Sequence, residues 1–104
     1  MEYKTHPKTR IGHIHLTVSN LERSIKFYRD ILGFQVTQYF GEQAVFLSAG
    51  GYHHHIGLNT WAGENATPPP PGHTGLYHFA ILYPNRCLLY TSPSPRGLLS
   101  ISYA

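Results

Sequence analysis

The sequence predicts an α+β fold in which one helix packs on a small sheet, with the element order β-α-β-β-β followed by one further strand. Three observations predict this fold. Residues 11–18 alternate between apolar and polar side chains, residues 20–32 carry apolar side chains at helical spacing, and short strand-like segments separated by glycines follow. At 104 residues, the chain is expected to form one domain with a single modest core.

The first strand is predicted at residues 11–18, IGHIHLTV. In an extended chain, Ile14 and Leu16 point to one face while His13 and His15 point to the other. The strand is therefore expected to be half-buried and to carry a polar face of its own.

A helix is predicted over residues 20–32. It follows the tetrapeptide SNLE at 19–22, which has the form of a capping box: the serine hydroxyl and the glutamate carboxylate bond to the free amides of the first turn. The apolar stripe comprises Leu21, Ile25, Tyr28 and Leu32. Gly33 lies where a left-handed residue ends a helix.

Three more strands are predicted, FQVTQYF at 34–40, AVFLSA at 44–49 and YHHHIGLN at 52–59. Glycine-containing turns separate them, which is typical of antiparallel hairpins. Residues 10–59 are thus predicted to form a βαβββ module. A polar lead, residues 1–9, precedes this module.

A connector and the start of a second module are predicted after this. Residues 60–75 lose periodicity, and their four consecutive prolines, 68–71, favour an extended polyproline conformation. Residues 76–86 begin with LYHFAIL, in which Tyr77-His78-Phe79 repeats the opening Gly12-His13-Ile14 pattern. We therefore expect residues 76–86 to supply the first strand of a second module.

The second module is expected to be incomplete. In the first module a capped amphipathic helix follows the strand, but residues 87–104 carry Pro93 and Pro95, and no helix runs through that pair. Without such a helix, we expect the apolar side chains Tyr77, Phe79 and Ile81 to be left uncovered.

Composition and charge exclude several classes of protein. The net charge of +3 arises partly from the lead, and no basic stripe follows, which argues against nucleic-acid binding. Cys87 is the only cysteine, so no internal disulfide forms. The first residues lack the apolar core of a signal peptide, and no apolar run spans a bilayer. We therefore expect a cytoplasmic protein without nucleic-acid or membrane partners.

Histidines are the most informative polar residues. Alternation along the strand at 52–59 places His53 and His55 on one face and His54 on the other, with Ile56. If the apolar face packs under the helix, His53 and His55 share a surface with His13 and His15. The repeat adds His78, so five histidines from three strands are expected to line one side of the sheet.

Two interpretations of this surface stay open. Neutral imidazole binds zinc, iron(II), nickel or manganese and titrates near neutrality, which favours metal-assisted chemistry. A single histidine on a strand is, however, more often a hydrogen-bonded structural residue. His54 is expected to be structural, whereas His15, His53 and Asn59 are candidates for substrate binding.

Four segments, which together cover about residues 10–85, carry a resemblance to a known family: IGHIHLTV, SNLERSIKFYRDILGF, AVFLSAGGYHHHIGLNTWAG and GLYHFAIL. They resemble the vicinal oxygen chelate superfamily, which includes glyoxalase I, extradiol ring-cleaving dioxygenases, fosfomycin-resistance thiol transferases and bleomycin-binding proteins. Within the superfamily, the chain is most similar to the catechol 2,3-dioxygenase-like branch. Residues 87–104 do not resemble the family and are interpreted as foreign sequence after a truncated second module.

The resemblance implies two βαβββ modules that close into a cup around one divalent metal, Fe(II) or Mn(II), with zinc or nickel as alternatives. It assigns the ligand of each module's first strand to His13 and His78, and a catalytic role or a further ligand to His55. The family's third ligand is a glutamate late in the second module. No carboxylate of this chain occupies a matching position.

The implied function is extradiol dioxygenase-like cleavage of a small catecholic substrate, impaired in this chain because the carboxylate ligand is missing. A glyoxalase-like isomerase, a thiol transferase and a non-catalytic drug-sequestering module are the alternatives. Association of two chains as a homodimer is a further expectation, since one module then closes against another.

Overall fold

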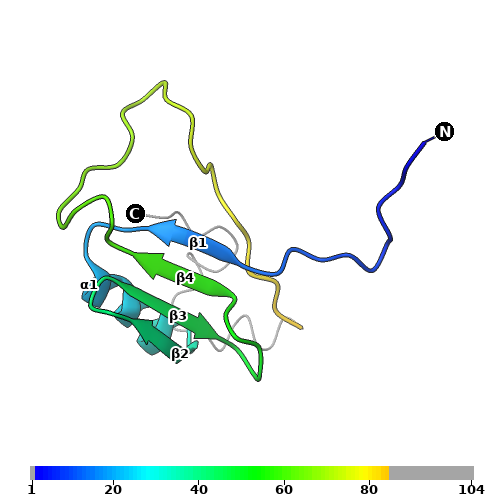
Figure 1. Cartoon of the computed structure of the whole chain (residues 1–104), viewed down its shortest axis with the longest axis horizontal. Coiled ribbons are helices and arrows are strands. Elements are labelled where there is room, and N and C mark those ends of the chain that lie inside the picture. The colour runs from blue at the N-terminus through cyan, green and yellow to red at the C-terminus, as the bar shows by residue number, and fades with distance from the viewer. Residues whose placement is uncertain (1, 85–104) are drawn as a thin grey trace.

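The structure, a computed structural model, describes residues 2–84 (Figure 1). Its elements in chain order are β1 (Ile14–Thr17), α1 (Leu21–Ile25), the π-helical segment η1 (Lys26–Ile31), β2 (Gln35–Phe40), β3 (Ala44–Ser48) and β4 (Ile56–Asn59). The predicted α+β class and the β-α-β-β-β order are confirmed. Predictions about residues 85–104, including the non-family tail, lie outside the described residues.

The four strands form one mixed sheet in the order β1-β4-β3-β2. β1 pairs with β4 in parallel, whereas β2 with β3 and β3 with β4 pair antiparallel. The helix crosses one face of the sheet (Figure 1). Because the first and last strands are neighbours, the residues just before β1 lie next to the loop that leads into β4.

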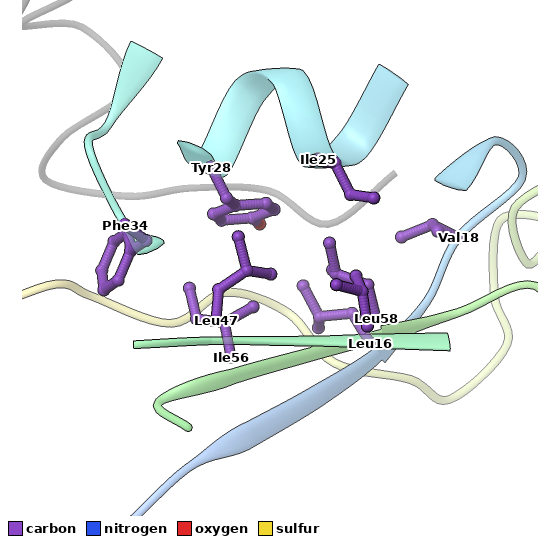
Figure 2. Packing of buried hydrophobic residues seen from close by; sticks show 9 residues of the cluster. Leu16, Val18, Ile25, Tyr28, Phe34, Leu47, Ile56 and Leu58 are labelled. Atoms are coloured by element: carbon purple, nitrogen blue, oxygen red, sulfur yellow. The ribbon is translucent and has the colours of Figure 1, made fainter. Parts of the chain in front are cut away.

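The hydrophobic core fills the space between the helix and the sheet (Figure 2). Leu47 and Leu58 are fully buried at 0% exposure, and Ile25 and Tyr28 cover them from the helix. Leu16 is also buried, so the apolar face predicted for residues 11–18 is confirmed. The opposite side of the sheet, called the open face below, carries His13, His15, Phe46 and Gly57; the last three lie side by side in the strand register.

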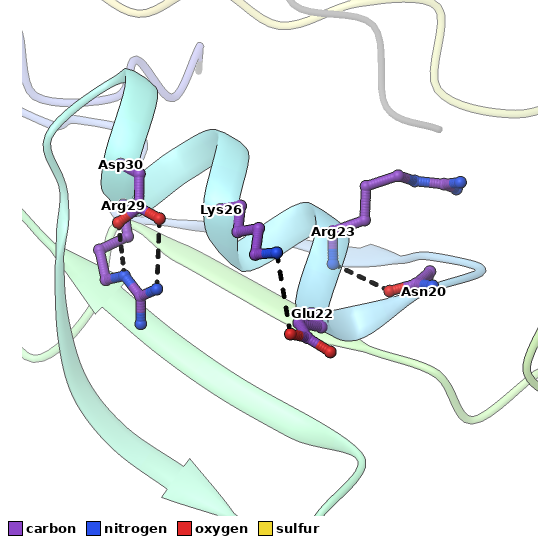
Figure 3. Close-up of polar contacts among 6 residues, drawn as sticks. All are labelled: Asn20, Glu22, Arg23, Lys26, Arg29 and Asp30. Atoms are coloured by element: carbon purple, nitrogen blue, oxygen red, sulfur yellow. Dashed lines mark hydrogen bonds and ion pairs between the residues drawn. The ribbon is translucent and has the colours of Figure 1, made fainter.

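The helix begins one residue later than a serine cap predicts. Asn20 has extended backbone angles (φ −147°, ψ 109°), and its side-chain oxygen accepts a hydrogen bond from the Arg23 amide at 2.8 Å (Figure 3). Ser19 Oγ instead accepts from the Arg23 guanidinium, and Glu22 pairs with Lys26 at 3.9 Å. The predicted capping box is therefore wrong, because Asn20 already supplies the oxygen that the first turn needs.

Replacing Asn20 by alanine is expected to destabilise the chain by about 1 kcal/mol, the usual cost of losing an N-cap side chain. The matched control is Ser19→Ala, which removes only a contact with an exposed guanidinium and is expected to change stability by less than about 0.5 kcal/mol. Urea unfolding of both variants measures the difference. Equal losses would show that the two side chains share the capping role.

The second half of the helix is wider than an α-helix. The Leu32 amide donates to the Phe27 carbonyl, five residues back, at 3.0 Å. Gly33 then takes a left-handed conformation (φ 87°), and the Phe34 amide donates to the Tyr28 carbonyl. The predicted glycine terminus is confirmed, whereas a regular α-helix to residue 32 is not, because residues 26–31 are π-helical.

Residues 76–84 lie partly against this core. Phe79 and Ile81 are half-buried and pack on the core cluster, and Phe79 occupies an isolated β-bridge position rather than part of a longer strand. Tyr77 is 87% exposed. The expectation that all three side chains would be uncovered is therefore correct for Tyr77 and wrong for Phe79 and Ile81, which find apolar contacts within the first module.

The connector arches away from the sheet before the chain returns (Figure 1). Its prolines, residues 68–71, are exposed and belong to no regular element. Across residues 2–84, we find no helix long and apolar enough to cross a lipid bilayer.

Candidate functional site

The open face carries a cluster of histidine and aromatic rings. Its members come from the residues around β1, from the centre of β3, from the loop before β4 and from Trp61, two residues after β4. The rings in mutual contact are those of His13, His15, Phe46, His53, His54 and Trp61. We refer to these six residues as the ring cluster.

His15 lies directly over a glycine of the neighbouring strand. A Cβ atom added at Gly57 would come within 2.9 Å of His15 Nδ1. The imidazole meets Phe46 edge-on, with ring centroids 5.8 Å apart, and tilts against Trp61 at 5.5 Å. Burial, and to a smaller extent the nearby His13, lowers the pKa of His15, which favours the neutral ring.

Gly57→Ala is expected to displace the His15 ring and to destabilise the chain by about 1 kcal/mol, because the new methyl group overlaps the imidazole. Gly51→Ala is the matched control, since a Cβ there meets nothing within 4 Å. Urea unfolding measures stability, and the NMR signals of the Trp61 indole report on its contact with His15. Unchanged indole signals in Gly57→Ala would contradict the packing described here.

The three consecutive histidines do not alternate as a strand would require. β4 begins at Ile56, so residues 52–55 belong to a loop. The His54 ring lies 4.4 Å from His13 and 4.7 Å from Phe46, centroid to centroid, and therefore on the open face. The expected placement of His54 on the helix side is wrong, because period-two alternation applies only within an extended strand.

His55 closes the loop that precedes β4. Its Nδ1 accepts a hydrogen bond from the Ala49 amide at 3.2 Å and lies 3.2 Å from Ser48 Oγ. An Nδ1 that accepts from an amide carries no hydrogen, so neutral His55 is protonated on Nε2 and the serine hydroxyl donates. The His55 ring also contacts Tyr52, with centroids 4.7 Å apart. These contacts give His55 a structural role, and its catalytic role stays a prediction.

His53 links the loop to the far edge of the sheet. Its Nε2 lies 3.0 Å from Gln38 Oε1, and its Nδ1 lies 2.7 Å from His54 Nδ1. The hydroxyl of Thr37 also donates to backbone carbonyls, those of Phe46 and His53, and so ties the loop to β2. His53 therefore bridges β2 and the ring cluster.

Gln38 is a site residue that the sequence did not predict. Strict alternation puts Gln38 on the same face as Val36, which packs against the core. The register of β2 against β3 shifts between Val36 and Gln38, and Gln38 pairs with Phe46 of the open face. The irregularity thus turns Gln38 towards His53. The position of Gln38 on the open face could have been predicted only with knowledge of this register shift.

Asn59 lies beneath the ring cluster. It is 3% exposed, and its Oδ1 accepts a hydrogen bond from the Trp61 amide at 3.0 Å. This bond holds the turn that sets Trp61, 58% exposed, beside His15. Asn59 therefore positions an aromatic residue, and direct contact of Asn59 with a substrate stays a prediction.

The two predicted metal ligands have different ring neighbours. His13 contacts His54, whereas the exposed His78 contacts Tyr77 with centroids 4.9 Å apart. On the helix, the Asp30 carboxylate is engaged by Arg29 at 2.8 Å (Figure 3). Within residues 2–84, no group of three or more His, Cys, Asp or Glu side chains is arranged to hold a metal ion. The described residues alone therefore do not complete a metal site.

The fold and this open-faced sheet match a known class of proteins. Residues 10–86 match the model of the Glyoxalase/Bleomycin resistance protein/Dioxygenase superfamily. The chain belongs to this superfamily, and the resemblance identified from the sequence is confirmed.

Two relatives define the similarity further. The chain is 53% identical over 79 residues to a protein named catechol-2,3-dioxygenase from Bacillus subtilis (strain 168), a match that covers 75% of this chain and 28% of that protein. It also resembles the crystal structure of lactoylglutathione lyase from Agrobacterium tumefaciens, with a TM-score of 0.56 and 23% identity, over 83% of this chain and 66% of the other. The lyase shares the fold, and this chain spans about a quarter of the length of the dioxygenase.

Proposed function

We propose that the chain forms one module of a metal-dependent enzyme of the vicinal oxygen chelate type, with extradiol ring-cleaving activity on a catecholic substrate. The observation that carries this proposal is the 53% identity to the Bacillus catechol-2,3-dioxygenase over 79 residues. That match is far closer than the 23% identity to the lyase, which supports the fold alone.

The open face supports an aromatic small-molecule substrate. Trp61, 58% exposed, offers a flat apolar surface, and beside it His15 offers an imidazole whose neutral form is favoured by burial, which lowers its pKa. Aromatic rings stack on such surfaces, while imidazole nitrogens bind hydroxyl groups. His15 is the residue proposed to bind a substrate hydroxyl group. His53 is proposed to contact the substrate with the face of its ring, because its two nitrogens are bonded to Gln38 and His54. Trp61 is added from the structure.

A divalent metal is implied by the superfamily, and it would supply Lewis acidity towards two adjacent substrate oxygens. Its proposed ligands in this chain are His13 and His78. Two imidazoles do not satisfy a site that needs three protein ligands, and the described residues offer no third donor grouped with them. We therefore assign the remaining ligand to a second module and expect weak or no turnover from this chain alone.

A non-catalytic binding module is the second proposal. It is favoured by one observation, that residues 2–84 carry an aromatic and histidine-rich face but no three-donor metal group. In this proposal, the histidines serve as hydrogen-bond partners of a sequestered ligand.

One comparison tests both proposals. Metal content and catechol-dependent oxygen uptake are measured for this chain and for the chain joined after residue 84 to the rest of the dioxygenase relative. We expect stoichiometric iron or manganese and ring cleavage only in the joined protein, and loss of both with His78→Ala. Equal metal content and activity in the two proteins would refute the need for a second module. Tight catechol binding without metal in either protein would favour the binding module.

A further inference from the structure

The sequence motif of three histidines is only partly explained by the proposed function. His55 closes its loop, but His53 and His54 form a hydrogen-bonded pair whose members come from the same loop and reach across the open face. With Gln38 from β2 and His13 next to β1, they form a continuous row above Phe46 of β3. The row runs from one edge strand of the sheet to the other.

The direction of each hydrogen bond in this row follows from the bond between Gln38 and His53. Gln38 Oε1 can only accept, so His53 Nε2 carries the hydrogen between them. In neutral His53, Nδ1 is then unprotonated and accepts from His54, 2.7 Å away. His54 therefore carries its hydrogen on Nδ1, and its Nε2 has a free lone pair.

We infer that Gln38 and His53 are positioning residues that hold His54 as a hydrogen-bond acceptor for a hydroxyl group of an aromatic ligand on the open face. This inference rests on the proposed function, because it specifies how a catecholic substrate is recognised. The ligand class follows from the surroundings: Phe46 lies under His54, and Trp61 continues the aromatic surface beyond His15.

The surroundings of His54 favour this role. The His54 ring is half-buried and is held between Phe46 and His13. Because His54 Nδ1 donates to His53, Nε2 is the nitrogen of the neutral His54 ring that is left to accept a hydroxyl hydrogen. A hydroxyl bound there lies beside His13, one of the two proposed metal ligands.

The test uses the full chain at about pH 8, where imidazoles are neutral, with a chelator present so that no metal contributes. Nitrogen-15 NMR of the imidazole rings identifies which nitrogen of His54 carries the hydrogen. Titration with catechol, and with benzene as the probe without hydroxyl groups, gives dissociation constants.

Three variants are compared with the wild type. Gln38→Leu removes the hydrogen-bond acceptor, Gln38→Glu retains an acceptor, and His54→Phe keeps an aromatic ring but no nitrogen. Gln35→Leu, an exposed position on the same strand, is the matched control.

We expect wild-type His54 to be protonated on Nδ1. Gln38→Leu is expected to abolish this preference and to weaken catechol binding about 2- to 10-fold, the value of one hydrogen bond, with His54→Phe equally weak or weaker. Gln38→Glu and Gln35→Leu are expected to stay within about twofold of wild type, and benzene binding is expected to be unaffected throughout.

Three results would overturn the inference: a hydrogen on His54 Nε2 in the wild type, equal effects of Gln38→Leu and Gln35→Leu, or catechol binding no tighter than benzene. None of these readouts needs turnover. If the joined enzyme neither binds metal nor cleaves catechol while this pattern holds, the proposed activity fails and the inference survives. If the joined enzyme is active but Gln38→Leu behaves as wild type, the proposed activity stands and the inference fails.

Discussion

Replacing Leu58 by alanine is expected to lower the free energy of unfolding by about 2–5 kcal/mol. Leu58 is 0% exposed and belongs to the central strand β4, paired with Leu16 of β1 and Val45 of β3. Truncation removes buried methyl groups and leaves a cavity that paired strands on both sides cannot close. Because a domain of this size is stabilised by about 5–15 kcal/mol, the loss is a large fraction of the total.

The matched control for this change is Leu82→Ala. Leu82 is 91% exposed, so the same truncation is expected to cost less than about 0.5 kcal/mol. Urea unfolding followed by circular dichroism gives both values. If the two variants lost equal stability, the helix and sheet would not enclose the core described here.

The buried half of this fold was predictable because it rests on local patterns. Period-two alternation in β1 identified Leu16 as a core residue, and Gly33 marked the helix end by its tolerance of a positive φ. Both signals depend only on neighbours in the sequence. The parallel pairing of β1 with β4 brings His13, just before β1, beside the loop that carries His54.

The open face was less predictable because irregular backbone positions decide it. A register shift in β2 turns Gln38 towards His53. Residues 52–55 form a loop rather than an extension of β4, and this loop places the His54 ring against His13. Neither irregularity is visible in the spacing of apolar and polar residues along the sequence. Strict alternation therefore assigned His54 to the wrong face of the sheet and did not identify Gln38 as a site residue. Contacts with side chains from other strands, rather than local propensity, fix these positions.

Alkaline pH is expected to destabilise the chain through Tyr28 alone by about 2–3 kcal/mol. Burial raises the pKa of Tyr28 to about 12 from the ordinary value of 10.0. The folded state therefore keeps the phenol neutral while the unfolded state ionises it. The stabilising contribution of neutral Tyr28 is complete below about pH 10. Above that pH it falls by about 1.4 kcal/mol per pH unit, and it is lost by about pH 12.

Tyr28→Phe isolates this effect, because it keeps the ring in the core and removes the titrating hydroxyl. Other tyrosines and lysines titrate in the same range, so the informative quantity is the difference in unfolding free energy between wild type and Tyr28→Phe at each pH. We expect this difference to be constant between about pH 7 and pH 9 and to shift in favour of Tyr28→Phe above about pH 10. Tyr39→Phe, at a tyrosine that is 55% exposed, is the matched control and is expected to show no such shift. A pH-independent difference for Tyr28→Phe would mean that the phenol reaches water in the folded chain, so that the helix does not seal the core at this position.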